Sequence, residues 1–125
     1  MGKHMFSAPQ PTHARRWPRG QRFGLSAPGI EAEAAYRAAV QDVRSLGRDA
    51  LTLAEKRWAD GLGLSPGDGV VMAEIRPGRR SFADLGQALQ DCGTVPAQIR
   101  ESVDRLVERG FVEPLPLPGA SAIVT

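Results

Sequence analysis

The stretch VPAQIRESVDRLVERGFVEPL, Val95 to Leu115, predicts a helix that ends at a glycine and runs into a strand. Thr94 is suited to cap the start of this helix, and Pro96 is suited to its first turn. Gly110 is suited to end it. Apolar side chains recur at helical spacing along one face: Val95, Ile99, Val103, Leu106 and Val107. The helix therefore buries one face, and the question is what the opposite, charged face contacts.

Two shorter helices are expected before this one. The first runs from about Pro66 to Arg76, with Val70, Val71, Met72 and Ile75 buried. Ser81 opens the second and forms a capping box with Asp84. The inner face of the second helix consists of Phe82, Leu85, Ala88 and Leu89. Asp91 to Gly93 then makes a tight turn into the helix of the opening stretch.

Both flanks of this region also carry a pattern. Downstream, Phe111 to Leu115 and Ala120 to Thr125 read as two short strands joined by a turn at Pro118 and Gly119. Upstream, Ile30 to Asp60 shows apolar residues at three- and four-residue steps, which predicts one long helix or two helices broken at Gly47. Gly61 to Gly69 has the composition of a loop. The helical segment is expected to pack on the domain that follows and to provide a homodimer contact.

Residues 1–29 are expected to lie outside the globular domain, which spans residues 30–125. Met1 to Met5 resembles a cloning remnant, and residues 6–29 have no apolar periodicity and many prolines, which predicts a disordered or loosely docked arm. The arm is basic, with Arg15, Arg16, Arg19 and Arg22 and no acidic residue. Outside these arginines and Lys3, eleven basic residues face fourteen acidic ones. The charge pattern is thus a basic tail on a slightly acidic body.

The segment from Val70 to Thr125 resembles the winged helix-turn-helix superfamily, in the style of MarR- and ArsR-like transcriptional regulators. SFADLGQAL resembles the second helix of that family, and IRESVDRLVERGFVE resembles its recognition helix and the entry to the wing. The resemblance implies a mainly α fold with a small β-hairpin. It further implies a cytoplasmic, bacterial transcription regulator that binds double-stranded DNA as a dimer.

By that resemblance, the helix after Thr94 enters a major groove and the wing meets phosphate. Gln98 matches the edge of adenine and Arg100 that of guanine. The arginines of the arm would add nonspecific affinity for phosphate. The DNA-contacting residues expected on these grounds are Arg79, Arg80, Ser81, Thr94, Gln98, Arg100, Arg105, Arg15, Arg16, Arg19 and Arg22.

A protein-interaction role is the alternative. The exposed face of the helix carries three arginines and three acidic residues, whereas a phosphate-facing surface usually has net positive charge. The expected wing, Gly110 to Thr125, contains no Lys or Arg. Its apolar residues Leu115, Leu117 and Ile123 suit a protein partner better than a phosphate. The sequence leaves both alternatives open.

Other function classes find little support in the sequence. There is no clustered histidine, no glycine-rich phosphate loop after a strand, and no apolar run of membrane-spanning length. We therefore expect neither an enzyme, nor a cofactor or metal site, nor a membrane protein. The single cysteine, Cys92, is expected to be a small, partly buried thiol rather than a redox sensor.

Overall fold

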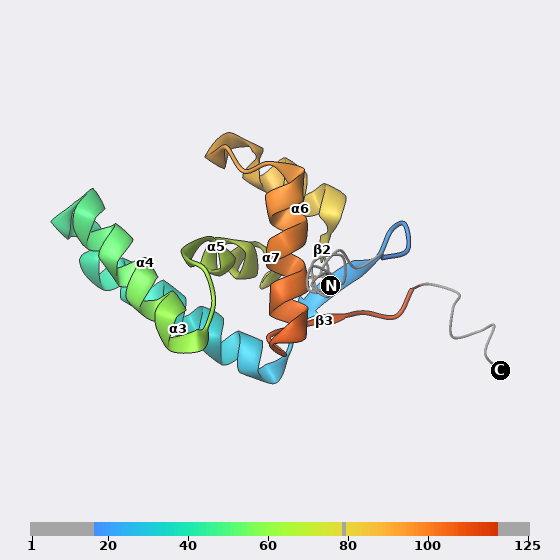
Figure 1. Ribbon diagram of the computed structural model, residues 1–125, viewed down its shortest axis with the longest axis horizontal. Coiled ribbons are helices and arrows are strands. Elements are labelled where there is room, and N and C mark those ends of the chain that lie inside the picture. The colour runs from blue at the N-terminus through green and yellow to red at the C-terminus, as the bar shows by residue number, and fades with distance from the viewer. Residues whose placement is uncertain (1–16, 79, 118–125) are drawn as a thin grey trace, which may run out of the picture.

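The computed structural model describes residues 17–78 and 80–117. It is mainly helical, with a small antiparallel sheet, as the sequence predicts (Figure 1). Along the chain the elements are β1 (Arg22–Leu25), α3 (Ala27–Val43), the 3-10 turn η1 (Arg44–Leu46), α4 (Arg48–Leu62), α5 (Pro66–Ile75), β2 (Arg80–Ser81), α6 (Phe82–Leu89), the 3-10 turn η2 (Gln90–Cys92), α7 (Pro96–Glu108) and β3 (Val112–Pro114).

The N-terminal strand β1 is the centre of the sheet, whose strand order is β2-β1-β3. Both pairings are antiparallel, with Phe23 opposite Arg80 on one side and Pro114 on the other. The prediction of a disordered arm is therefore wrong for residues 17–29. Phe23 is fully buried. Burial of this ring and two ladders of backbone hydrogen bonds stabilise the ordered segment, although its polar, proline-rich composition predicts disorder. Residues 1–16 lie outside the described residues.

Only the first strand of the predicted hairpin lies within the described residues. The first expected strand exists as β3, but its partner is β1 from the other end of the chain. The second expected strand, Ala120 to Thr125, lies outside the described residues. Leu115 N donates to the carbonyl of Arg22 at 2.9 Å, and the side chain of Gln21 donates to the carbonyl of Leu115. The segments that lead to the two ends of the chain therefore leave the sheet side by side.

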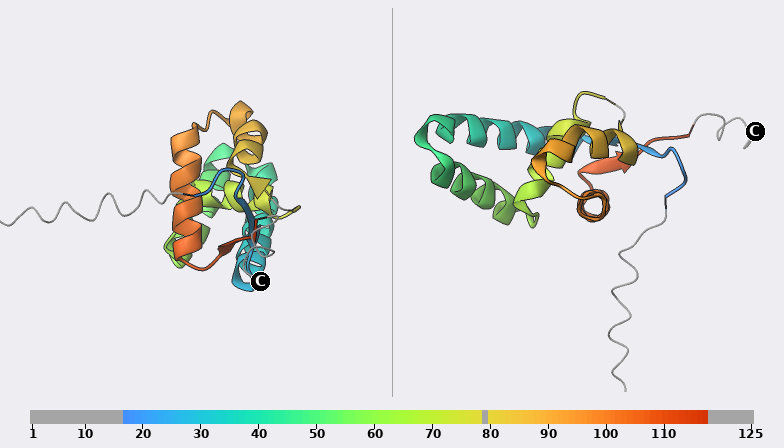
Figure 2. Two further views of the ribbon diagram at one scale, coloured as in Figure 1. Left: turned by 90° about the vertical axis from the view of Figure 1, so that its right-hand side faces the viewer. Right: turned by 90° about the horizontal axis from the view of Figure 1, so that it is seen from above.

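Residues 30–60 form two helices rather than one. At Gly47 the backbone adopts φ 107° and ψ 176°, which a side chain rarely tolerates, and the chain reverses there. Helices α3 and α4 then lie side by side and project away from the other elements (Figures 1 and 2). The indole Nε1 of Trp58 on α4 donates to the carbonyl of Ala32 on α3 at 3.0 Å. The loop predicted for Gly61 to Gly69 is shorter than expected, because α4 continues to Leu62 and α5 begins at Pro66.

The core lies where α5, α6, α7 and the sheet meet. Its buried side chains include Phe23, Met72, Ile75, Leu85, Leu89, Ile99, Val103, Leu106 and Val112. The predicted inner faces of the helices supply most of these, but Phe23 comes from the segment that was expected to be disordered. Val70 and Ala88 are less buried than predicted. No helix within the described residues is long and apolar enough to cross a bilayer.

Candidate nucleic-acid interface

Helices α6 and α7 pack on each other and are joined by the turn η2 and residues 93–95. Leu85 and Leu89 of α6 and Ile99 and Val103 of α7 are buried against the core. Gly93 adopts φ 74° after η2, as expected of a residue that ends a helical turn. Val95, rather than Thr94, is the N-cap of α7, and its backbone N–H donates to Oε1 of Gln98 at 3.2 Å. The outward residues of the first two turns of α7 are exposed: Ala97, Gln98, Arg100 and Glu101.

The start of α6 is closed by the predicted capping box. The backbone N–H of Ser81 donates to the Asp84 carboxylate at 2.9 Å, and that of Asp84 donates to the Ser81 hydroxyl at 3.1 Å. Arg22 from β1 pairs with the same carboxylate at 3.2 Å. The backbone hydrogen bond from Ser81 is the main cause of a lowered pKa of Asp84; the Ser81 hydroxyl and the charges of Arg22 and Arg80 lower it further, against the effect of desolvation. An ion pair therefore connects strand β1 to the start of α6.

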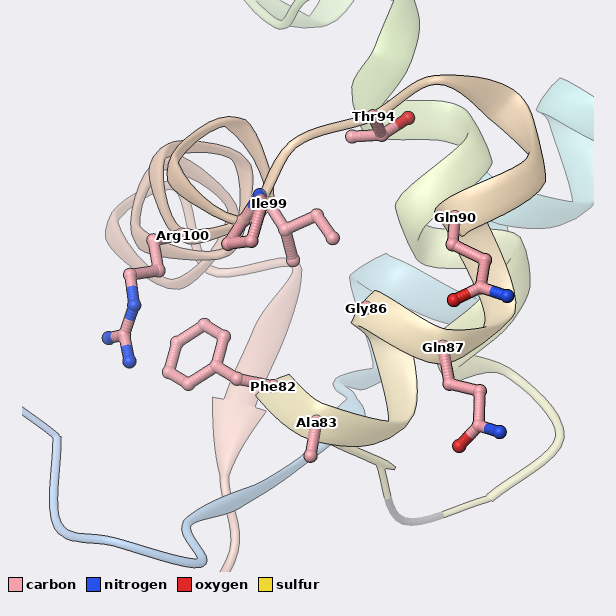
Figure 3. Close-up of a pocket in the computed structure, with 9 residues that line it drawn as sticks. Phe82, Ala83, Gly86, Gln87, Gln90, Thr94, Ile99 and Arg100 are labelled. Atoms are coloured by element: carbon pink, nitrogen blue, oxygen red, sulfur yellow. The ribbon is translucent and has the colours of Figure 1, made fainter.

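An open groove of about 600 Å³ runs between α6 and α7 (Figure 3). Phe82 at the start of α6 points toward α7, and Ile99 and Arg100 approach it from α7 (Figure 3). The guanidinium carbon of Arg100 lies 4.4 Å from the centre of the Phe82 ring, which is cation–π distance. Gln87, Gln90 and Thr94 also line the groove. The groove thus combines an apolar floor with amides and one cation.

A second, smaller recess of about 340 Å³ shares Phe82 and Arg100 with this groove and is bounded by the segment before β1. The indole Nε1 of Trp17 donates to Oδ1 of Asp104 on α7 at 2.8 Å. The Trp17 ring also meets Phe23 edge-to-face, with 5.2 Å between ring centres. Arg19 lines the recess and is exposed. The described part of the basic segment therefore lies against the outer face of α7.

Arg105 has a different position from the other candidate DNA contacts. Its Nε and one terminal nitrogen donate to the Asp68 carboxylate of α5 at 2.9 and 3.2 Å. The buried Ser102 hydroxyl donates to the same carboxylate, as does the backbone N–H of Ser65. The hydrogen bond with Asp68 is the main cause of a raised Arg105 pKa. These contacts join the start of α5 to the middle of α7 and set the angle between the two helices.

The remaining predicted residues are placed as follows. Arg80 donates through Nε to the carbonyl of Glu74, so part of its guanidinium is used within the domain. Thr94 is half-buried where the turn meets the groove. The side chains of Arg15, Arg16 and Arg79 lie outside the described residues. The structure thus brings Arg19, Ser81 and Arg100 to one recess beside Phe82. Gln98 and Arg105 line another recess between α7 and α5, and Arg22 and Arg80 are bound to Asp84 and to the carbonyl of Glu74.

Three residues of this surface were not singled out in the sequence analysis as site residues. Gln87 and Gln90 lie three residues apart, opposite the buried Leu85 and Leu89, so the amphipathic pattern of α6 was a usable signal. Phe82 was assigned only to an inner face.

Cys92, expected to be partly buried, is exposed in η2, because the turn holds it away from the core.

No group of three or more His, Cys, Asp or Glu side chains suited to a metal ion occurs within residues 17–78 and 80–117. No family model, no curated protein and no solved structure matches this chain. Residue chemistry and geometry are therefore the basis for a function.

Proposed function

We propose that this chain is a winged helix-turn-helix protein that binds double-stranded DNA, with α7 in the major groove and the Arg-rich N-terminal segment acting as the wing. The observation that carries the proposal is the pairing of β1 with β3 beside α7. The segment around β3 has no basic residue, which is one of the two arguments against DNA. Strand β1 and the turn before it bring Arg19 and Arg22 beside β3, and Arg19 is the cation that would meet phosphate there, because Arg22 pairs with Asp84.

The charge distribution fits this assignment. Phosphate contacts provide most of the affinity of DNA-binding proteins, and they require Lys or Arg near the backbone. Arg19 and Arg100 are exposed on two sides of the recess beside Phe82. Two acidic groups of the same face are already neutralised or hydrogen-bonded, since Asp84 pairs with Arg22 and Asp104 accepts from Trp17. Arg15 and Arg16 directly precede Trp17 in the sequence and would add to the charge.

Within this proposal the residues have separate roles. Gln98 and Arg100 face outward from the first turns of α7 and would read base edges, as amide and guanidinium groups do in a major groove. Arg19, Arg22, Arg80, Ser81 and Thr94 would hold phosphates at the margin, together with Arg79. Arg105 would act indirectly, because its pair with Asp68 sets the angle of α7 on α5.

We further propose that the protein is a homodimeric bacterial transcription regulator, with the projecting α3–α4 pair as the contact between copies. Leu46 at the tip of the pair and Leu53 on α4 are 70% and 47% exposed. A dimer formed there would carry two α7 helices at a distance from the contact, as palindromic DNA sites require.

A protein-binding role is the second candidate, and the groove of Figure 3 is the observation that favours it. Phe82, Ile99 and Pro96 give this groove an apolar floor of the kind that receives a side chain of a partner. Under this alternative, loss of positive charge has little effect, whereas a bulky side chain at Gly86, which lines the groove and where an added Cβ meets no atom within 4 Å, weakens the complex.

Fluorescence anisotropy with mixed-sequence duplex DNA at two salt concentrations tests the DNA proposal. Arg19→Ser is expected to weaken binding and to lower the salt slope by about one. Arg57→Ser, which removes an equal charge from the exposed face of α4, is the matched control and should bind as the parent does. Equal weakening by both changes, or no binding at low salt, would contradict the proposal.

The role of the tail needs a deletion that spares the fold. Removal of residues 6–16 leaves Trp17 and β1 in place, whereas removal through Ser26 would also take away the buried Phe23. The shorter deletion is expected to keep the unfolding temperature and to lose part of the DNA affinity. If the shortened protein keeps full DNA affinity, then the arginines that follow residue 16 alone supply the positive charge for binding.

A further inference from the structure

A third recess, distinct from the groove of Figure 3 and from the recess beside Trp17, is lined by residues of α5, η2 and α7. Its volume of about 430 Å³ is within the range of small-molecule sites, roughly 300–1,000 Å³. Val70, Val71 and Leu89 supply apolar lining from α5 and α6. Thr94 lines both the groove and this recess, so a molecule bound here would touch the turn that positions α7.

The polar groups of the recess are divided between its floor and its rim. The Asp68 carboxylate is 1% exposed and accepts hydrogen bonds from Ser65, Ser102 and Arg105, so it belongs to the fold and is already satisfied. Glu101 lines the rim and is exposed. The lining holds two carboxylates, Asp68 and Glu101, and one guanidinium, Arg105, which interacts with both, so its net charge is negative by one and Glu101 is its exposed acidic group.

We infer that this recess binds a small amphipathic amine, with the apolar body against Val70 and Leu89 and the ammonium group beside Glu101. The apolar walls favour a hydrocarbon or aromatic body, and the negative rim favours a cation over a carboxylate. A molecule held there contacts Thr94 and Gln98 from the side of α5. Because the proposed function assigns Gln98 to base readout, a molecule held beside it is expected to alter DNA binding, and this consequence rests on the proposed function.

Cys92 makes the binding step measurable without DNA. It is the sole cysteine of the chain, it is exposed, and it lines the recess. Two disulfide fragments with the same phenylalkyl body, one ending in a primary amine and one in a carboxylate, are equilibrated with the full chain in excess 2-mercaptoethanol. Intact mass spectrometry then gives the fraction of protein captured by each fragment. The same chain unfolded in urea gives the intrinsic reactivity of the thiol toward each fragment.

Capture by the folded chain, relative to the unfolded chain, is expected to favour the amine fragment by about fivefold, as exposed charge pairs allow. Glu101→Gln should remove the preference for the amine without abolishing capture. Gly67→Phe should lower capture of both fragments, because Gly67 lines the recess and a Cβ added there meets no atom within 4 Å. Equal capture of both fragments at the unfolded level, or an amine preference that survives Glu101→Gln, would overturn the inference.

The effect of the captured fragment on DNA binding is measured in a separate experiment. Anisotropy of the chain carrying the amine fragment on Cys92 is compared with that of unlabelled protein. If the protein binds DNA but does not capture the fragments, the amine-binding role of the recess is refuted and the proposed function is not. If the protein captures the fragments normally but binds no DNA, the proposed function is refuted and the amine-binding role is not.

Discussion

At the scale of single residues, two glycines of α5 with the same local conformation have opposite tertiary surroundings. A Cβ at Gly69 would overlap the ring of Tyr36 from α3, whereas a Cβ at Gly67 meets nothing within 4 Å. We expect Gly69→Ala to lower the free energy of unfolding by about 1–3 kcal/mol through overpacking. Gly67→Ala should leave stability unchanged or raise it by up to about 1 kcal/mol. Urea unfolding of the two variants measures the difference, and equal effects would show that α5 does not pack on Tyr36.

Asp68 is the other residue whose role is set by its neighbours. Asp68→Asn keeps the volume but removes the charge that Arg105 and Ser102 hold. We expect the free energy of unfolding to fall by about 1–3 kcal/mol. The cost of a fully buried, unpaired charge would be larger, but Arg105 is partly exposed and can be hydrated. Chemical denaturation gives the value. Asp60→Asn, which breaks an exposed pair with Lys56, is the control and should change stability by less than about 0.5 kcal/mol.

At the scale of elements, the cap of α6 makes a pH-dependent contribution to stability. The pKa of Asp84 is lowered in the folded protein, so its carboxylate stabilises the fold above the ordinary aspartate pKa, about 4. That stability is lost as the pH falls toward the lowered pKa. Asp84→Asn should therefore lose less stability than the parent between pH 6 and pH 3. Thermal unfolding at the two pH values checks this. Equal losses of stability in the parent and in the variant would show that the Asp84 carboxylate does not cause the pH dependence.

Strand β1 is the element whose removal should matter most. Phe23→Ala is expected to cost about 3–5 kcal/mol, because the ring is fully buried between Trp17 and Phe82. Ile30→Ala at an exposed position of α3, outside the proposed dimer contact, should cost less than about 0.5 kcal/mol. Unfolding curves of both variants give the comparison. A small effect of Phe23→Ala would mean that the N-terminal segment is dispensable for folding.

At the scale of the whole molecule, the projecting α3–α4 pair makes the oligomeric state testable. If two copies meet at its outer half, the double change Leu46→Glu and Leu53→Glu should shift the mass in light scattering from dimer to monomer. Ile30→Glu places the same charge on another exposed apolar position, at the start of α3, and should leave the dimer intact. A monomeric parent protein, or equal disruption by both changes, would contradict the proposed contact.

Local signals were sufficient for several parts of the fold. The face of α7, the capping box at Ser81 and Asp84 and the turn ending at Gly93 all depend on residues within a few positions of one another. Helical periodicity and side-chain capping are short-range effects, so the sequence predicts them directly. The same holds for the polar outer face of α7, which supplies the candidates Gln98 and Arg100.

The sequence offered a break at Gly47 as one of two alternatives, and the packing of α3 on α4 selects it. Two features were decided by the tertiary structure alone: Phe23 pairs opposite Pro114 from the far end of the chain, and Arg105 turns to Asp68. Each depends on which distant surface is available, and neither local propensity nor composition contains that information. A polar, proline-rich segment becomes the central strand because the helices leave a buried place for its phenylalanine and unpaired backbone groups on both sides.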